Sequence, residues 1–421
     1  MGNAQSPATN PRFTSATRLF SQKELDDLKS LFNSLAAQSQ SGGKYISISV
    51  FKVYIGIKGA LGDRLYDLVT QNRKDQKLTF EDLVIAKGTY EKGTKVEIDE
   101  FLYQLCDVDG DGNLVRSDLE AAISGILDSI FSQKEAESSS ASDHKPISIF
   151  LDAANFTKDN EGNSEKSMPF EDFRSWLQLV PAARKFLASL LKPKLSSPSS
   201  EVPNLIYQKD IDSSMLLLKE EYAWHIGGAL SHLESSEWKL LYHSSLNGLS
   251  FNTFLGNTSN AEGPTVLIIK DKEGYIYGGY ASQPWERHAD FYGDMKSFLF
   301  QLYPRASIYR PTGANNNIQW CAVNFSSDSI PNGIGFGGRA GHFNLFISAN
   351  FDNGHTFTGP TFNNPCMSKN NRIYPDVIEC WSIIQKGTQQ EKQDGVKGTV
   401  LERFKEERNM LNLVGIANSS N

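Results

Sequence analysis

A Pro- and Ser-rich segment divides the sequence into two parts with different residue patterns. The segment is Lys192-Pro193-Lys194-Leu195-Ser196-Ser197-Pro198-Ser199-Ser200. Before it, apolar residues recur at helical spacing; after it, aromatic and β-branched runs alternate with Gly, Asn, Asp and Pro. Because 421 residues exceed what one core usually organises, we expect two or more folding units joined by a linker at residues 192–204. The predicted fold class is α+β.

Composition and charge exclude several broad classes of protein. The 42 Lys and Arg residues against 49 Asp and Glu residues give a formal net charge of −7, and no long basic run suggests a nucleic-acid partner. No stretch approaches the roughly 18 apolar residues of a membrane-spanning helix. The four cysteines lie far apart without a C-x-x-C pair, so we expect reduced thiols in a cytoplasmic protein.

The first six residues, Met1-Gly2-Asn3-Ala4-Gln5-Ser6, match the N-myristoylation pattern M-G-x-x-x-[ST], with Gly2 as the acceptor. The alternative is an ordinary frayed start of the flexible arm that we expect over residues 1–20. One myristoyl chain binds membranes only marginally, and no neighbouring cysteine offers a second acylation site. Attachment to a membrane surface therefore requires a second contact, for which a protein partner is expected.

Helical patterning extends over residues 21–191, which we predict to be an EF-hand-like domain. It begins with a capping box formed by Ser21 and Glu24. The Ser-rich segment 133–145 lacks periodicity and is predicted to be a mobile insertion.

Residues 107–118 resemble the metal-binding loop of an EF-hand, with helical sequence on both sides. Gly112 stands at the sharp turn of position 6, and Leu114 is the apolar residue of position 8. Residues 71–82 and 161–172 align with the same pattern but lack its acidic ligands, so we predict structural hands without metal. The alternative for residues 107–118 is an Asp-rich surface loop. The predicted metal ligands are Asp107, Asp109, Asp111, Asn113 and Asp118.

This loop departs from the usual pattern in a way that predicts weak Ca²⁺ binding or a preference for Mg²⁺. Val115 at position 9 cannot hold a ligand water through its side chain, and Asp118 at position 12 is one methylene shorter than the usual Glu. A shorter carboxylate chelates a large ion less well. Calorimetric titration should therefore give a Ca²⁺ dissociation constant in the micromolar range or weaker; much tighter binding would contradict the prediction.

The sequence beyond the linker favours an antiparallel β-sandwich with flanking helices. Turn sequences at residues 271–274 and 352–354 suit antiparallel hairpins. Helical patterning in this part is limited to residues 215–233 and 294–302, followed by a charged amphipathic helix at 398–416. The predicted strands are residues 238–242, 265–270, 275–280, 319–325 and 342–350.

Residues 212–382 resemble the TLDc domain family. The resemblance rests on the order and spacing of seven blocks: residues 238–245, 248–251, 277–280, Trp285, 291–294, 335–338 and 378–381. We place the domain at residues 205–385. It implies a β-sandwich flanked by helices, in agreement with the strand pattern.

The domain order, together with Met1-Gly2-Asn3, is similar to the mTOR-associated, lysosomal branch of the TLDc family. This resemblance implies a cytoplasmic protein held peripherally on a lysosomal, vacuolar or other endomembrane. It also implies binding to the vacuolar-type proton-pumping ATPase and a role in oxidative-stress resistance. The TLDc domain and the terminal helix, with Phe404 and Leu411 on its apolar face, are the parts expected to touch the pump.

Enzymatic activity is the less favoured interpretation, with a thiol- or histidine-based antioxidant activity as the alternative to a binding role. A third alternative is a calcium sensor in which the TLDc domain is only a scaffold. Gly335, Gly337 and Gly338 belong to a glycine run that lacks the strand-and-helix context of a dinucleotide site, so tight turns explain them better. Glu379 is expected to be a buried structural anchor, and Trp381 a core residue.

Overall fold

The computed structural model describes residues 10–71, 75, 77–131, 146–159, 165–192, 202–230, 237–259, 261, 263–327 and 329–384. Several predicted features lie outside these residues. They are the acylation site Gly2, the insertion at 133–145, most of the linker at 192–204, and the terminal helix at 398–416 with Phe404 and Leu411.

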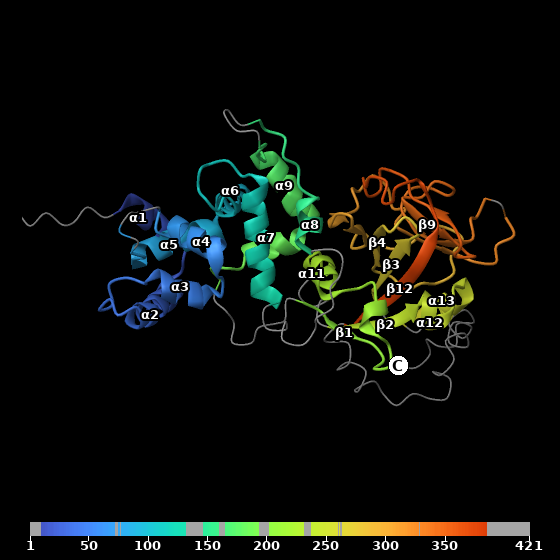
Figure 1. The fold of residues 1–421 in the computed structure, drawn as a ribbon, viewed down its shortest axis with the longest axis horizontal. Coiled ribbons are helices and arrows are strands. Elements are labelled where there is room, and N and C mark those ends of the chain that lie inside the picture. The colour runs from blue at the N-terminus through green and yellow to red at the C-terminus, as the bar shows by residue number, and fades with distance from the viewer. Residues whose placement is uncertain are drawn as a thin grey trace, which may run out of the picture.

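The N-terminal half is helical (Figure 1). Within the described residues, none of its helices is long and apolar enough to cross a membrane. Its elements are α1 (Pro11–Thr17), α2 (Gln22–Gln38), α3 (Ile48–Ile55), α4 (Gly59–Val69), α5 (Phe80–Lys92), α6 (Lys95–Cys106), α7 (Arg116–Phe131), α8 (Pro146–Leu151), α9 (Phe170–Leu179) and α10 (Pro181–Leu187).

The start of the chain differs from the predicted flexible arm. Residues 11–17 form α1, with Asn10 accepting the Arg12 amide as its cap and Pro11 at the first helical position. Ala16 and Phe20 are buried with Leu28 of α2 and Val84 of α5. The expectation for residues 11–20 is therefore wrong, because a few spaced apolar side chains suffice to dock a short helix on its neighbours.

Backbone bridges join the inter-helix loops of the helical half in two pairs. Ile46, between α2 and α3, pairs with Leu78, between α4 and α5. The Met168 amide donates to the Leu114 carbonyl at 2.7 Å, which joins the α6–α7 loop to the segment before α9. Leu78 and Met168 occupy position 8 of the aligned residues 71–82 and 161–172, as Leu114 does in residues 107–118. Ile46 marks a fourth loop that the alignment missed.

Among its described residues, the C-terminal half contains two stacked sheets, three short α-helices and a 3₁₀ turn at Ser213–Met215 (Figure 1). The larger sheet has the order β1-β2-β12-β3-β4-β5-β6, and the smaller β11-β10-β9-β8-β7. All neighbours are antiparallel except β1 and β2. The elements are β1 (Asn204–Ile206), α11 (Glu220–Gly228), β2 (Glu237–His243), α12 (Ser244–Asn247), α13 (Phe251–Thr258), β3 (Thr265–Asp271), β4 (Ile276–Ala281), β5 (Phe298–Tyr303), β6 (Ser307–Tyr309), β7 (Gln319–Ala322), β8 (Gly333–Phe336), β9 (Leu345–Ser348), β10 (Gly354–His355), β11 (Arg372–Ile373) and β12 (Pro375–Ile384).

Two helix predictions in this half need correction. Residues 298–303 form β5, because Phe298 and Phe300 face the helical half while Leu299 faces the smaller sheet. A strand that is buried on both faces lacks the alternation that distinguishes it from a helix. Of the predicted helix at 215–233, residues 215–230 are described; among them the α-helix is limited to Glu220–Gly228, and residues 216–218 precede it as buried, non-helical chain.

The larger sheet lies between the helical half and the smaller sheet. On β3, Val266 and Ile268 belong to the cluster formed with the helices, whereas Leu267 and Ile269 belong to the cluster between the sheets. The Ala306 amide also donates to the Ile149 carbonyl of α8 at 2.9 Å. The described residues on either side of the predicted linker therefore share one buried core.

His225 on α11 lies in this shared core. Its side chain is fully buried, with its ring 5.7 Å from that of Phe150 on α8. Burial lowers the pKa of His225 to about 3, because it disfavours the charged imidazolium. The unfolded chain then binds a proton below about pH 6.5 that the folded chain does not bind, so acid lowers stability as pH falls from 6.5 towards 3.

We predict that His225→Phe weakens this acid sensitivity. Between pH 7 and pH 5, the variant should lose about 2 kcal/mol less unfolding free energy than the wild type, as measured by urea denaturation. His342→Gln, at an exposed position, is the control and should follow the wild type. Parallel pH profiles for wild type and His225→Phe would contradict the prediction.

Candidate metal centre

The predicted metal loop connects α6 to α7. Asp107 is the C-cap residue of α6, and Asp118 lies in the first turn of α7. Gly110 and Gly112 have φ values of 75° and 89°, which glycine adopts without steric cost. The loop thus turns tightly enough to bring the first and last carboxylates together.

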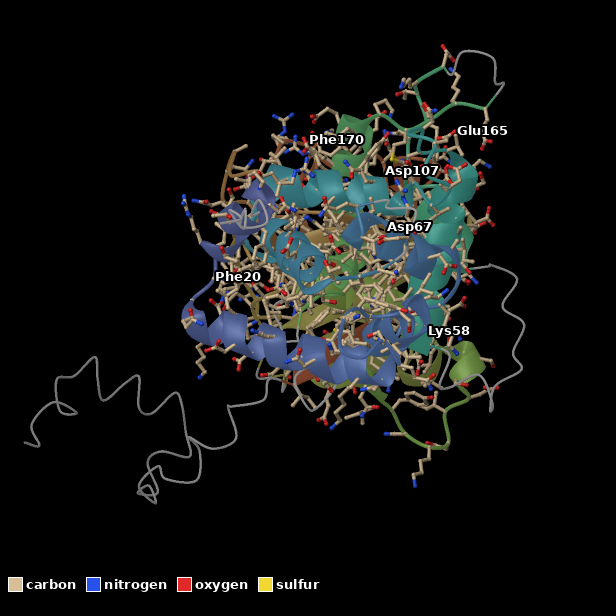
Figure 2. All side chains as sticks on the ribbon, turned by 90° about the vertical axis from the view of Figure 1, so that its left-hand side faces the viewer. Phe20, Lys58, Asp67, Asp107, Glu165 and Phe170 are labelled. Carbon is tan, nitrogen blue, oxygen red and sulfur yellow. The ribbon has the colours of Figure 1, made fainter. Side chains whose placement is uncertain are left out.

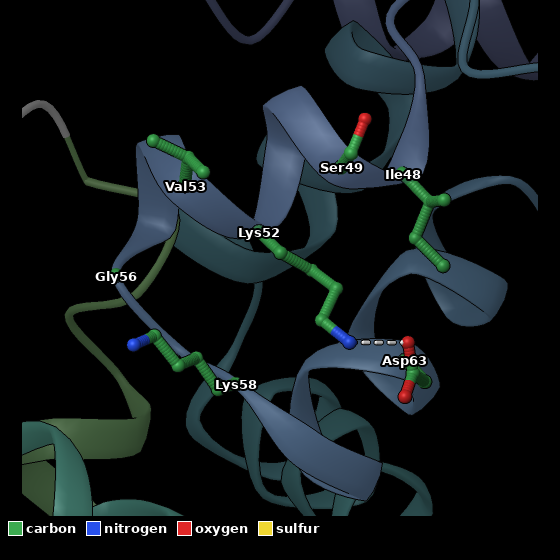
Figure 3. Close-up of a pocket in the computed structure, with 7 residues that line it drawn as sticks. All are labelled: Ile48, Ser49, Lys52, Val53, Gly56, Lys58 and Asp63. Atoms are coloured by element: carbon green, nitrogen blue, oxygen red, sulfur yellow. Dashed lines mark hydrogen bonds and ion pairs between the residues drawn. The ribbon is translucent and has the colours of Figure 1, made fainter.

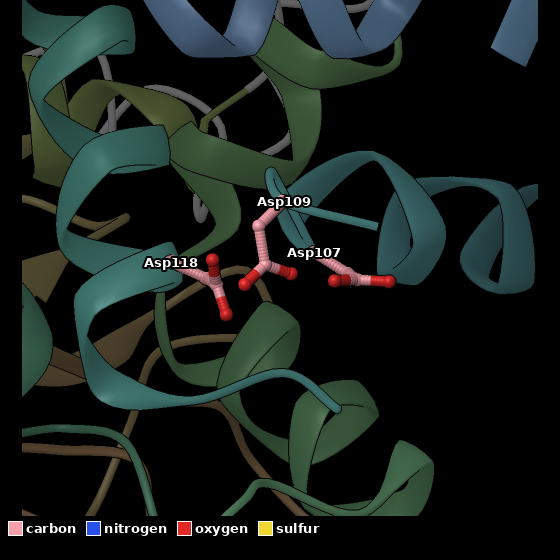
Figure 4. Close-up of side chains that lie close together, drawn as sticks. All are labelled: Asp107, Asp109 and Asp118. Carbon is pink, nitrogen blue, oxygen red and sulfur yellow. The ribbon is translucent and has the colours of Figure 1, made fainter. Parts of the chain in front are cut away.

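Three of the five predicted ligands converge. Carboxylate oxygens of Asp107, Asp109 and Asp118 lie within 4.8 Å of one another, and Figure 4 shows the three side chains close together. Among the described residues, this is the one group of three or more His, Cys, Asp or Glu side chains so arranged. Asp111 instead accepts the Asn113 amide at 2.7 Å. The structure thus assembles positions 1, 3 and 12 of the loop.

Backbone amides hold the carboxylates in place. Asp107 accepts the Gly110 and Gly112 amides, both at 3.1 Å, and Asp118 accepts the Val115 amide at 3.1 Å. Asp107 and Asp118 are buried, while Asp109 is exposed. The cluster therefore has two fixed members and one that faces solvent.

The electrostatics of the cluster favour a bound cation. Burial raises the pKa of Asp118 to about 6, and the neighbouring Asp109, Asp107 and Asp111 charges add to the effect. Burial likewise raises the pKa of Asp107. Three carboxylates form the hard oxygen donor set that Ca²⁺ and Mg²⁺ prefer, so the residues present fit either ion.

Of the two other aligned loops, residues 161–172 are joined to this one by the Met168–Leu114 hydrogen bond, whereas residues 71–82 pair with the loop containing Ile46. Gln71 donates to Asp82 at 3.3 Å, which connects the first and last positions of residues 71–82 through an amide. In residues 161–172, Asp172 accepts the Thr157 hydroxyl at 2.7 Å, and α8 already ends at Leu151. The helix that precedes these residues, α8, therefore ends well before position 1 of the aligned pattern, although Met168 still lies opposite Leu114.

The sequence alignment missed the loop containing Ile46. The sequence does indicate a loop here, because the apolar Ile46 follows Gly42-Gly43 between two helical patterns. The loop lacks the acidic residues that would identify it as an EF-hand loop. Figure 2 views this end of the molecule and shows Asp107 on the opposite side from Phe20.

A surface hollow of about 540 Å³ lies between α3 and α4 (Figure 3). Two of its three charged lining residues, Lys52 and Asp63, already pair at 2.6 Å; the third is Lys58, and Val53 is 82% exposed. The hollow therefore offers no free convergent polar groups that would define a catalytic site.

The glycine run closes a turn between β8 and β9. A Cβ atom on Gly335 would lie 2.6 Å from the Leu345 carbonyl oxygen, and one on Gly338 would lie 2.2 Å from the His342 carbonyl oxygen. Gly337 and Gly338 have φ values of 64° and 78°. Close backbone approach and positive φ account for these glycines without a ligand.

Glu379 on β12 is fully buried on the face of the larger sheet that meets the helical half. It accepts the Leu217 and Leu218 amides at 2.5 and 3.2 Å and the Trp381 indole N–H at 2.9 Å. His243 Nε2 lies 3.5 Å from it. The carboxylate thereby fixes the segment that precedes α11 against the sheet.

We predict that Glu379→Gln lowers the unfolding free energy by about 1–3 kcal/mol, because an amide cannot accept all three N–H donors and leaves one buried without a partner. Chemical denaturation measures the change. Glu273→Gln is the control: Glu273 is half exposed and pairs with Lys369, so its loss should cost about 0.5 kcal/mol or less. Equal effects of the two variants would refute the anchoring role.

Comparison with known proteins identifies the class of the C-terminal half. The TLDc domain model matches residues 211–384, so this part of the chain is a TLDc domain, and both the predicted resemblance and the α+β class are confirmed. The match covers the two sheets and α11 to α13.

The chain is also similar to proteins named MTOR-associated protein MEAK7. It is 28% identical to that of Danio rerio over 275 residues, covering 63% of this chain and 60% of the relative. It is 30% identical to that of Mus musculus over 257 residues, covering 58% and 54%. Oxidation resistance protein 1 of Mus musculus is 26% identical over 217 residues, covering 51% of this chain and 22% of the relative. The match to the MEAK7 proteins thus spans somewhat more than half of their length, and it extends beyond the TLDc domain.

Proposed function

We propose that this protein is a non-enzymatic adaptor that binds the vacuolar-type proton-pumping ATPase through its TLDc domain and contributes to oxidative-stress resistance. The TLDc match at residues 211–384 carries the proposal. The relatives' names support a regulatory role: two kinds are named for mTOR association and for oxidation resistance, and none of those reported is named as an enzyme. An mTOR-containing complex is a second partner consistent with these names.

The cysteines give little support to an intrinsic thiol activity. Cys106, Cys321 and Cys380 are fully buried, and burial raises the pKa of Cys321 and of Cys380 to about 12. Peroxide-reactive cysteines need an accessible thiolate. Cys366 alone among the four is partly exposed. Protection through a bound partner therefore agrees better with the structure than does chemistry in the TLDc domain.

The proposal includes a metal-dependent N-terminal module of the EF-hand type. Ca²⁺, bound weakly, or Mg²⁺ would be held by Asp107, Asp109 and Asp118. The loop connects directly to α7, which contacts α8, and α8 bonds to the TLDc sheet through Ile149 and Ala306. A shift of α7 on metal binding would thus be transmitted towards the TLDc domain.

Myristoylation at Gly2 would place the adaptor on a lysosomal, vacuolar or other endomembrane. One acyl chain is insufficient for stable attachment, so binding to the pump would supply the second contact. Both interactions together retain the protein where neither does alone.

Affinity purification with the full-length chain tests the proposal. Truncation is unsuitable, because removing the TLDc domain exposes the apolar surface that the helices share with β3 and β5. We predict that the tagged chain, incubated with detergent-solubilised endomembranes, recovers subunits of the vacuolar proton pump identified by mass spectrometry. Their absence both with Ca²⁺ or Mg²⁺ and with chelator would overturn the proposal.

The same experiment tests the metal dependence with a matched pair of variants. Asp109→Asn with Asp118→Asn removes two charges from the candidate metal centre, whereas Asp26→Asn with Asp27→Asn removes two exposed charges from α2. Pump recovery should respond to chelator in the wild type and in the α2 variant but not in the loop variant. Identical responses of all three would remove metal from the proposal while leaving the adaptor role.

The second candidate, an intrinsic antioxidant activity, rests on the partial exposure of Cys366. Peroxide consumption by the purified protein that is lost in Cys366→Ser would favour it. Retention of cellular protection by Cys366→Ser would support the adaptor.

A further inference from the structure

Arg64 of α4 lies against the metal loop although it is more than 40 residues away in sequence. Its Nη2 atom is 3.6 Å from Asp107 Oδ2, and its side chain is 11% exposed. A Cβ atom built on Gly110 would lie 2.5 Å from Arg64 Nη1, so the guanidinium contacts the loop backbone at its fourth position. The positive charge therefore lies beside the first of the three converging carboxylates.

The guanidinium is held in this place. Arg64 Nε donates to the Gln104 carbonyl at 3.0 Å, in the last turn of α6 just before the loop. Behind Arg64, α4 packs closely on α7: a Cβ atom on Gly125 would lie 3.3 Å from Leu61 Cβ. With its base fixed by this packing and its Nε fixed by a carbonyl, the side chain has little freedom to move away from Asp107.

We propose that Arg64 is a built-in counter-ion that sets the divalent-cation affinity of this loop. The inference rests on the metal centre of the proposed function. With the carboxylates ionised and no metal bound, the guanidinium partly neutralises the cluster. An incoming ion must bind Asp107 while this charge remains a few ångströms away. Arg64 thus lowers affinity independently of Val115 and Asp118, which weaken the ligand set itself.

The size of the effect follows from Coulomb's law. A unit charge roughly 5–6 Å from a divalent ion, at an effective dielectric constant between those of protein surface and water, changes the affinity by at least about tenfold. The interaction is screened by salt, because the site lies near the surface. Removal of the charge should therefore tighten the binding of Mg²⁺ and of Ca²⁺ alike.

Another arginine of the loop provides a matched control. Arg116, at position 10, pairs with Asp152 at 2.8 Å and is 46% exposed. Its charge is already neutralised by a partner outside the cluster. Arg116→Gln removes the same charge from the same loop, but it should change the affinity less than about threefold.

The test is calorimetric titration of the full-length protein with MgCl₂ and with CaCl₂. Arg64→Gln should bind both ions about tenfold more tightly than the wild type, and the difference should shrink as NaCl is raised. Arg64→Lys, which keeps the charge, should stay near the wild type. Arg64→Met, which keeps the aliphatic stem without a charge, should match Arg64→Gln, and circular dichroism verifies that each variant is folded.

Each outcome decides between distinct claims. Unchanged or weaker binding in Arg64→Gln and Arg64→Met would overturn the counter-ion role while leaving the metal centre intact. A gain of affinity that does not depend on salt would also overturn it, because a structural change would then be responsible. Absence of binding in the wild type and in all variants at millimolar ion would overturn the metal centre itself.

Discussion

The structure depends on a larger sheet that is apolar on both faces. Residues 265–269 of β3 are all buried, and residues 266–269 point alternately towards the helical half and towards the smaller sheet. Neither face tolerates water, so the sheet needs a cover on each side. The smaller sheet provides one cover and the helices provide the other. The helical half thus covers a face of the TLDc domain that must be buried. A ligand bound to the helices would therefore bind to a body that is continuous with the TLDc domain.

Charge is distributed differently in the two halves. The larger sheet of the TLDc domain buries two carboxylates, Asp271 and Glu379. Glu379 accepts three N–H donors, so its charge serves to fix a segment of chain. The metal loop brings three carboxylates together, and the buried pair among them has raised pKa values. Among the residues that the structure describes, Arg64 is the one basic residue that approaches this group closely enough to form an ion pair. The Glu379 carboxylate has its hydrogen-bond donors within the protein, whereas the three carboxylates of the loop keep negative charge that a cation can neutralise.

Predictions from local sequence patterns were correct where a short stretch of chain determines its own structure. The capping box at Ser21 and Glu24 forms as predicted, and the turn glycines of residues 107–118 adopt positive φ. The predictions of secondary structure were wrong where residues distant in the sequence bury the segment. Residues 298–303 have apolar side chains on both faces, and only their place between β4 and β6 makes them a strand. Residues 11–17 gain their order from contact with α5.

The sequence by itself determined the identity of the TLDc domain, the α+β class and the position of the candidate metal loop at residues 107–118, because each depends on residue types at fixed spacing. The tertiary structure decided which of the predicted ligands converge: Asp107, Asp109 and Asp118 meet, while Asp111 is not part of this group. It also decided that the two halves share a core and that Arg64 lies beside Asp107. The shared core and the Arg64–Asp107 contact join residues that are tens to hundreds of positions apart. Local spacing in the sequence does not predict such contacts.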